Sequence, residues 1–262
     1  MAVVEANLTD LKRKLFAPFE KIGRLKLDPV QVKIKVAQEG SKERQLAADV
    51  IDCVYNSLYR KDNGNIVNIG RDRFDSLPGT VTLVGTQEVA GNFPVVVTLR
   101  VVSDKHLEIF DFFQPKENTR WPHEVGDYKA GEIGRLSFNP GLDFVRANSQ
   151  DAKDAKLIDD YKRDIFRMIY SFGLEILRSN GVETPYYMVG PHVNRFLVSC
   201  GLYAVRIDNV ESKRTPEVEA IRQEFRDYWH SDKIALKMSG AIPADEIKFQ
   251  DLHNIVENLS IT

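Results

Sequence analysis

The segment from Pro94 to Val102 constrains the fold more than any other part of the sequence. Six of the eight residues after Pro94 are valine or leucine, and the two exceptions are Thr98 and Arg100. A run of β-branched apolar residues predicts a strand that is buried on both faces, in the middle of a sheet. The residues from Thr80 to Thr86 predict a second strand, and a turn at 89–92 joins the two as an antiparallel hairpin.

Further strands and helices follow from the spacing of apolar residues. Between Val30 and Val36, apolar and polar residues alternate, as in a half-buried strand. From Ala155 to Ser179, apolar residues recur every three or four positions, which predicts a long amphipathic helix. A shorter helix is expected to begin near Ser41. The remaining strands are expected at Glu132–Phe138, Tyr186–Val189 and Leu202–Ile207.

These elements together predict an α/β (α+β) fold with a mixed sheet. The hairpins make the first half of the sheet antiparallel, and a strand–helix–strand crossover near Pro191 adds a local parallel pair. Helices should cover both faces of this central, mostly antiparallel sheet. We expect one domain over residues 1–262, with a core at about 30–207, an N-terminal helix at 8–23 and a C-terminal helical extension at 216–262.

The composition argues against several classes of protein. Of 262 residues, 36 are basic and 38 acidic, and a net charge of −2 does not suit a protein built mainly to bind nucleic acid. No stretch approaches the roughly 18 consecutive apolar residues of a membrane span. The histidines lack metal-ligand spacing, so we expect no metal site. Two lone cysteines, Cys53 and Cys200, fit a reducing compartment, and we expect a cytoplasmic location.

Three groups of charged residues stand beside or inside the apolar strands. Asp72 and Asp75 precede the hairpin, Arg100 lies inside its second strand, and Glu132 and Arg135 lie in the strand that follows. A charge inside an apolar strand is costly unless it is paired. Arg100 therefore needs a carboxylate partner, and Asp72, Asp75 or Glu132 could each supply it.

The spacing of Glu132 and Arg135 predicts an irregularity in their strand. Side chains alternate along a strand, so two residues three positions apart face opposite sides of a sheet. If both act at one site, a bulge or a strand end has to break the alternation. Gly134 between them is a suitable bulge residue. We therefore expect a β-bulge there.

The order of these motifs resembles a known enzyme group. The motifs are Asp72-x-x-Asp75, a hairpin ending in Arg100, a phenylalanine-rich segment and Glu132-x-x-Arg135. This pattern, over roughly Val30 to Ile207, resembles the autoinducer (acyl-homoserine lactone) synthases and the long-chain N-acyl amino acid synthases, both of the GNAT acyltransferase superfamily. The resemblance implies a GNAT-like fold with a splayed pair of strands.

The resemblance also implies roles for individual residues. Asp72 and Asp75 would line the acceptor side, and Arg100 would pair with them. Glu132 would help to deprotonate the attacking amine, with Arg135 as its partner. The alternatives are solvated loop carboxylates at Asp72 and Asp75 and a structural Glu132–Arg135 ion pair. The phenylalanines would form the wall of an acyl pocket or simply part of the core; they are Phe110, Phe112 and Phe113.

Two departures from the resembled groups bear on the substrates. The synthases that use S-adenosylmethionine carry an arginine, a phenylalanine and a tryptophan upstream of the acidic pair, whereas here the nearest upstream aromatics are Tyr55 and Tyr59. The acetyl-coenzyme A enzymes carry a glycine-rich diphosphate loop, which residues 138–142 lack. The first departure argues against the lactone-forming activity that uses S-adenosylmethionine, and the second favours an acyl carrier protein over coenzyme A as donor.

A candidate surface for such a carrier lies on the long helix. Carrier proteins are acidic, and basic side chains would attract them. Acidic residues interleave with the basic ones along this helix, so a solvated helix face is the competing interpretation. The residues expected to dock the carrier are Lys156, Arg163 and Arg167.

The sequence therefore predicts an N-acyltransferase. It would move a medium or long acyl chain from an acyl carrier protein, or from acyl-coenzyme A, to the amine of an amino acid or similar small acceptor. No tightly bound cofactor is expected, because the acyl thioester is a co-substrate. Two alternatives remain open: a homoserine lactone synthase using S-adenosylmethionine, and a catalytically silent acyl-binding domain of the same fold.

Overall fold

The structure is a computed structural model of the 262-residue chain. It describes residues 8–20, 27–59, 70, 72–89, 91–126, 129–149, 151–189, 191–201, 204–219 and 234–238. Within these ranges, no helix is long and apolar enough to cross a membrane.

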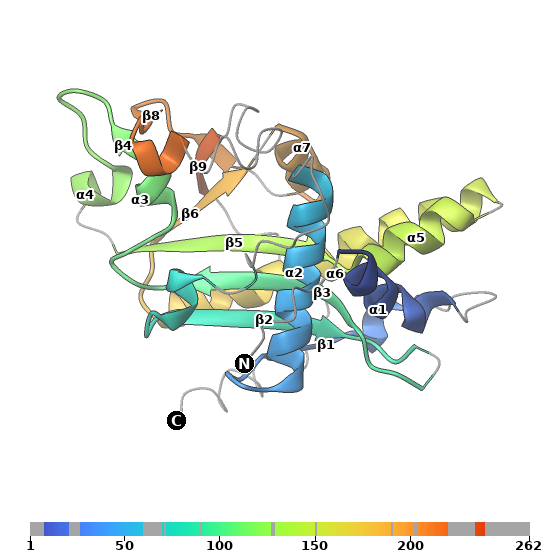
Figure 1. The fold of residues 1–262 in the computed structure, drawn as a ribbon. Helices are drawn as coiled ribbons and strands as arrows, with labels where there is room; N and C mark the ends of the chain where they lie inside the picture. The colour runs from blue at the N-terminus through green and yellow to red at the C-terminus, as the bar shows by residue number, and fades with distance from the viewer. Residues whose placement is uncertain are drawn as a thin grey trace.

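A seven-stranded mixed sheet forms the centre of the molecule, in the order β1-β2-β3-β5-β6-β9-β7 (Figure 1). β5 and β6 pair in parallel, and the other neighbours pair antiparallel. The predicted mixed, mostly antiparallel sheet is thus confirmed. The strands are β1 (Lys33–Val36), β2 (Thr80–Thr86), β3 (Val95–Val102), β5 (Ala130–Phe138), β6 (Thr184–Val189), β7 (Ala204–Arg206) and β9 (Ile234–Met238). A separate two-stranded sheet joins β4 (Phe113–Pro115) to β8 (Val210–Ser212).

Helices cover both faces of the sheet, as predicted. α2 (Lys42–Tyr59) crosses one face, and α6 (Ala152–Ser179) lies against the other (Figure 1). Asp151 caps the first turn of α6, because its carboxylate accepts a hydrogen bond from the backbone N–H of Lys153 at 2.8 Å. The other helices are α1 (Leu8–Glu20), α3 (Ile109–Phe112), α4 (Pro122–Gly126), α5 (Pro140–Asn148) and α7 (Pro191–Ser199), with 3₁₀ turns η1 (Pro29–Gln31) and η2 (Arg73–Ser76).

The core forms where α6 lies directly on the middle of the sheet. All eight residues of β3 are buried, as its apolar sequence predicts. Gly173 allows the close approach, because a Cβ atom there would come within 3.1 Å of Leu99 and Val101. The residues of β3 that face α6 are thus apolar, and Arg100 projects toward α2.

Two predicted elements differ from the structure. The strand expected from Val30 begins at Lys33, because a 3₁₀ turn at Pro29–Gln31 precedes it. The Asp28 carboxylate caps this turn by accepting a hydrogen bond from the N–H of Val30 at 3.0 Å. The C-terminal extension, expected to be helical from residue 216, is helical at 216–219 but supplies strand β9 at Ile234–Met238, which lies between β6 and β7. The expected helical residues at 21–23, 220–233 and 239–262 lie outside the described residues.

The predicted bulge in β5 is confirmed, one residue further along than expected. Thr98 pairs with Ser137 and Arg100 with Gly134, so a single residue of β3 lies opposite two residues of β5. Arg135 rather than Gly134 takes the left-handed conformation, with φ of 54°. The bulge turns Arg135 toward α2, where its guanidinium lies 5.2 Å from the centre of the Tyr55 ring.

The strand pair β5–β6 splays apart, as the resemblance implies. The two strands pair where Ala130–Glu132 meets Thr184–Tyr186, and β6 then continues in register with β9 (Figure 1). After Glu132, β5 therefore no longer pairs with β6. In the described part of the chain, the backbone N–H groups along the edge of β5 that faces β6 make no ladder pairs with β6 beyond Glu132.

Candidate active site

Two arginines and two carboxylates form a charged cluster on the α2 face of the sheet. Its members are Asp72, Arg100, Glu108 and Arg135, and each arginine contacts both carboxylates. Arg100 Nη1 lies 2.8 Å from Asp72 Oδ1, and its Nη2 donates to Glu108. Arg135 Nη2 donates to Asp72 Oδ2 at 2.9 Å and to Glu108 Oε1 at 2.7 Å. Arg100 is 2% exposed, so the cluster supplies the pairing that its burial demands.

Asp72 and Asp75, the two aspartates of the first motif, make different contacts. Asp72 caps η2 by accepting from the N–H of Phe74 at 2.9 Å, and Asp75 accepts from the N–H of Asp72 at 2.8 Å, which completes a capping box. Asp75 pairs with Arg44 of α2 at 2.9 Å. Of the three partners considered for Arg100, Asp72 makes the contact, while Asp75 fastens the loop to α2.

The loop before η2 is further anchored to α2 through Gly70. The Gly70 N–H donates to Asp52 Oδ1 at 2.7 Å, and its carbonyl oxygen accepts from Arg44 Nη1 at 3.2 Å. A Cβ atom at Gly70 would lie 2.4 Å from the Ala48 carbonyl oxygen, so the loop can approach α2 this closely only with glycine. These contacts hold Asp72 in place beneath Arg100.

Glu132 lies beside the charged cluster but is held differently. It is 2% exposed, and its Oε2 accepts a hydrogen bond from the backbone N–H of Ile109 at 2.9 Å. Burial and, after it, the charge of Glu108 raise the pKa of Glu132 to about 8, although Arg100, the Ile109 N–H and Arg135 each oppose the shift. Its expected partner Arg135 instead pairs with Asp72 and Glu108.

Charge balance is consistent with a protonated Glu132. Burial opposes ionisation of Asp72, but the charges of Arg100 and Arg135 outweigh it and lower the pKa of Asp72. Two arginines then face two carboxylates, Asp72 and Glu108. A third carboxylate would leave a net negative charge in a buried place, so the neutral form of Glu132 is favoured.

We expect the stability of the wild-type protein to fall with rising pH relative to Glu132→Gln. The pKa of Glu132 is 4.5 when unperturbed and about 8 in the fold, so the folded chain holds a proton that the unfolded chain releases between these values. The contribution of this group to stability falls by about 1.4 kcal/mol per pH unit in that interval. Urea unfolding of both proteins from pH 5 to 8 measures the difference, and parallel stability curves would contradict the raised pKa.

An aromatic group packs beside the start of β5, where β5 pairs with β6. Phe110 lies 4.8 Å from Trp121 and 5.4 Å from His123, measured between ring centres. The Tyr186 hydroxyl lies 3.0 Å from His123 Nδ1 and accepts from the His123 N–H at 3.2 Å. Phe112, expected with Phe110 in an acyl pocket, is buried in the core beside this group.

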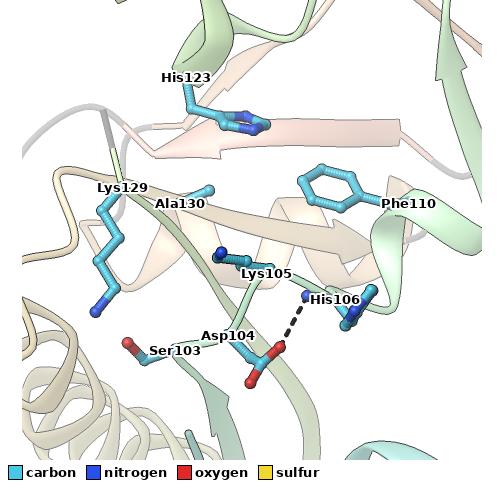
Figure 2. Close-up of a pocket in the computed structure, with 8 residues that line it drawn as sticks. All are labelled: Ser103, Asp104, Lys105, His106, Phe110, His123, Lys129 and Ala130. Atoms are coloured by element: carbon cyan, nitrogen blue, oxygen red, sulfur yellow. Dashed lines mark hydrogen bonds between the residues drawn. The ribbon is translucent and has the colours of Figure 1, made fainter. Parts of the chain in front are cut away.

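A cavity of about 640 Å³ opens against this aromatic group (Figure 2). Figure 2 shows the rings of Phe110 and His123 on one side, with Lys105 crossing the middle and Asp104 on the opposite side. Both aromatic and charged side chains therefore face the same space. Its lining residues are Ser103, Asp104, Lys105, His106, Phe110, His123, Lys129 and Ala130.

The helix that follows β5 offers few groups to a diphosphate. Pro140 at the first turn of α5 has no N–H, and the N–H of Gly141 donates to Asn139 Oδ1 at 2.8 Å. Leu142 N–H donates to the Asn139 carbonyl oxygen at 3.0 Å. Phe19 of α1 also packs on this turn, because a Cβ atom at Gly141 would lie 2.3 Å from its ring. The amides that bind anions at a helix N-terminus are thus absent or used.

The residues expected to dock a carrier protein are only partly available. Arg163 pairs with Asp160 at 2.8 Å, and Arg167 Nε donates to the Cys200 carbonyl oxygen at 3.0 Å. Lys156 is exposed. The structure therefore places two of the three expected residues in contacts within the protein itself.

Sequence reasoning missed Glu108, the carboxylate that joins both arginines of the charged cluster. It stands between Leu107 and Ile109 in an apolar segment, and all three are buried. A charge in an apolar segment is the signal that singled out Arg100, and it applies equally here. In the described part of the chain, no group of His, Cys, Asp and Glu could hold a metal ion.

No protein-family model and no curated protein sequence matches the chain. Among similar solved structures, FeeM, an N-acyl amino acid synthase from uncultured soil microbes, is 12% identical, with a TM-score of 0.43 over 81% of this chain and 90% of that chain. The AHL synthase LasI is 11% identical, with a TM-score of 0.43 over 81% of this chain and 93% of that chain. The two represent the enzyme groups that the motifs resemble. Similarities this low establish no shared activity, which has to follow from the geometry of the site.

Proposed function

We propose that the chain is an N-acyltransferase that moves an acyl group from a carrier thioester to the amine of a small acceptor. The observation that supports this most is Glu132, a buried carboxyl group with a pKa of about 8, placed at the last β5 residue that pairs with β6 and just before the bulge in β5. A group that exchanges protons near neutral pH is suited to general base catalysis. The site beside it combines paired charges with an aromatic cavity, as an acceptor of mixed polarity requires.

The reaction forms one bond and breaks one. The neutral amine attacks the thioester carbonyl carbon, the C–N bond forms, and the C–S bond breaks as the thiolate leaves. The amine loses a proton and the thiolate takes one up. The ionised form of Glu132, whose fraction grows as the pH approaches the pKa of about 8, receives the proton. An intervening water carries it, because the side chain is 2% exposed. The backbone edge of β5 beyond Glu132 supplies N–H donors to the oxyanion of the tetrahedral intermediate.

The N-terminus of α5 supports a carrier protein rather than coenzyme A as donor. Pro140 and the capped N–H of Gly141 leave little to bind the diphosphate of coenzyme A. We expect a kcat/KM for acyl carrier protein at least about tenfold above that for coenzyme A with the same acyl chain, a difference of about 1.4 kcal/mol. Steady-state kinetics with both thioesters measures the ratio. Equal values would contradict the donor assignment.

Mass spectrometry of lipid extracts from cells that express the chain tests the reaction class. An N-acyl amino acid that is present with the wild type and strongly reduced with Glu132→Gln would support the proposal. An acyl-homoserine lactone would favour the lactone synthase. The absence of any new acyl product would favour a silent acyl-binding domain.

A further inference from the structure

The cavity beside Phe110 and His123 lies next to the proposed site of proton transfer. Ala130, which lines the cavity, is two residues from Glu132 on the same face of β5, a separation of about 7 Å. A second link runs through α3, where the N–H of Ile109 binds Glu132 and the next residue, Phe110, lines the cavity. Glu132 does not itself line the cavity, but a small molecule there would contact Ala130 and Phe110, the two residues through which the cavity adjoins Glu132.

One side of the cavity carries an excess of positive charge. Lys105 and Lys129 line it together with a single carboxylate, Asp104, which accepts a hydrogen bond from the N–H of His106 at 3.0 Å. Lys129 donates to the Asn180 carbonyl oxygen at 2.6 Å. Lys105 is exposed and makes no ion pair within the described ranges. This side of the cavity suits an anionic group on the ligand.

A buried hydroxyl adds a specific donor on that side. The Ser103 Oγ is buried and makes no hydrogen bond in the part of the chain that the structure describes. A buried polar atom without a partner is costly, and a ligand atom that accepts its hydrogen bond removes that cost. A carboxylate, with two acceptor oxygens, can serve Ser103 and Lys105 together.

The opposite side of the cavity is apolar. The rings of Phe110 and His123 stack with an interplanar angle of 23°. Burial lowers the pKa of His123, so its imidazole is neutral at pH 7 and adds no charge to this wall. Flat, uncharged rings offer a surface for an apolar or aromatic side chain.

We propose that this cavity holds the acceptor, an α-amino acid with an apolar side chain, its carboxylate toward Lys105 and Ser103 and its side chain against Phe110 and His123. The proposal rests on the proposed N-acyltransferase function, because the amine of this ligand is the group to be acylated. It assigns the choice of acceptor to Lys105, Ser103 and Phe110, of which only Phe110 belongs to a sequence motif.

Acyl-transfer kinetics with phenylalanine and phenylalaninamide test the carboxylate contact. The amide keeps the amine and the ring but lacks the negative charge. We expect kcat/KM to be about tenfold higher for the acid, and Lys105→Gln to raise its KM about fivefold to tenfold while kcat stays within twofold. Lys116→Gln, at another exposed lysine, is the control and should match the wild type. Equal rates for acid and amide, unaffected by Lys105→Gln, would overturn the proposal.

A binding measurement separates this proposal from the proposed function. Trp121 lies 4.8 Å from Phe110, so its fluorescence should respond to a ligand in the cavity, and Trp229→Phe removes the other tryptophan signal. Saturable quenching by phenylalanine, weaker with phenylalaninamide and lost in Lys105→Gln, supports the site even if no acyl transfer occurs. Transfer to an amine with no saturable quenching by either ligand contradicts the site while leaving the function standing.

Discussion

Replacing Arg100 with methionine should lower the free energy of unfolding by about 3–5 kcal/mol. The guanidinium is buried in β3 and contacts both Asp72 and Glu108. Methionine fills much of the same volume but leaves two carboxylates facing Arg135 alone. Urea unfolding at pH 7 measures the loss, and Arg120→Met at an exposed arginine should change the stability by less than about 0.5 kcal/mol.

The double variant Arg100→Met/Glu108→Gln distinguishes a charge effect from a packing effect. If uncompensated charge causes the loss, removing Glu108 along with Arg100 should restore a substantial part of the stability, with a coupling energy of about 1–3 kcal/mol. Additive losses would mean that Arg100 matters for its volume and that the charged cluster is not a cooperative unit.

Replacing Glu132 with glutamine should slow acyl transfer by about 10²–10⁴-fold without unfolding the protein. Glutamine has nearly the same shape, and its side-chain oxygen can still accept the hydrogen bond from the N–H of Ile109. It cannot accept a proton. The wild-type rate should rise with pH through the pKa of Glu132, about 8, and the residual rate of the variant should lack that rise.

The control for this variant is Glu117→Gln, which makes the same change at an exposed glutamate. It should retain the wild-type rate and pH profile. If Glu132→Gln also retained them, Glu132 would be a structural residue, and another group would have to accept the proton.

Much of the fold could be predicted because local patterns agree with the tertiary structure. The apolar run at Val95–Val102 identifies the central strand, and the helical spacing after residue 155 identifies α6. The odd spacing of Glu132 and Arg135 predicts the bulge once both residues are taken to act at one site. The position of β9 depends on pairing with strands more than 25 residues away, and local patterns do not encode such partners.

Part of the candidate site could be predicted from the charges that lie within apolar strands. A buried charge needs a partner, so the sequence alone predicts that Arg100 pairs with one of the carboxylates near it. Which carboxylate makes the contact depends on the path of the loop: Gly70 and Arg44 turn Asp75 toward α2, and the chain after β3 brings Glu108 back beneath Arg100. The cavity was not predictable, because it brings together residues from separate loops and from the start of β5.

Acyl transfer by the purified protein tests the central claim most directly. The protein would be mixed with an acyl carrier protein that bears a dodecanoyl thioester and with a pool of amino acids, and the products followed by mass spectrometry. We predict that an N-dodecanoyl amino acid forms in step with the free carrier thiol, and that Glu132→Gln suppresses both. A thioester that stays intact, or that releases dodecanoic acid no faster than without the protein, would contradict the account.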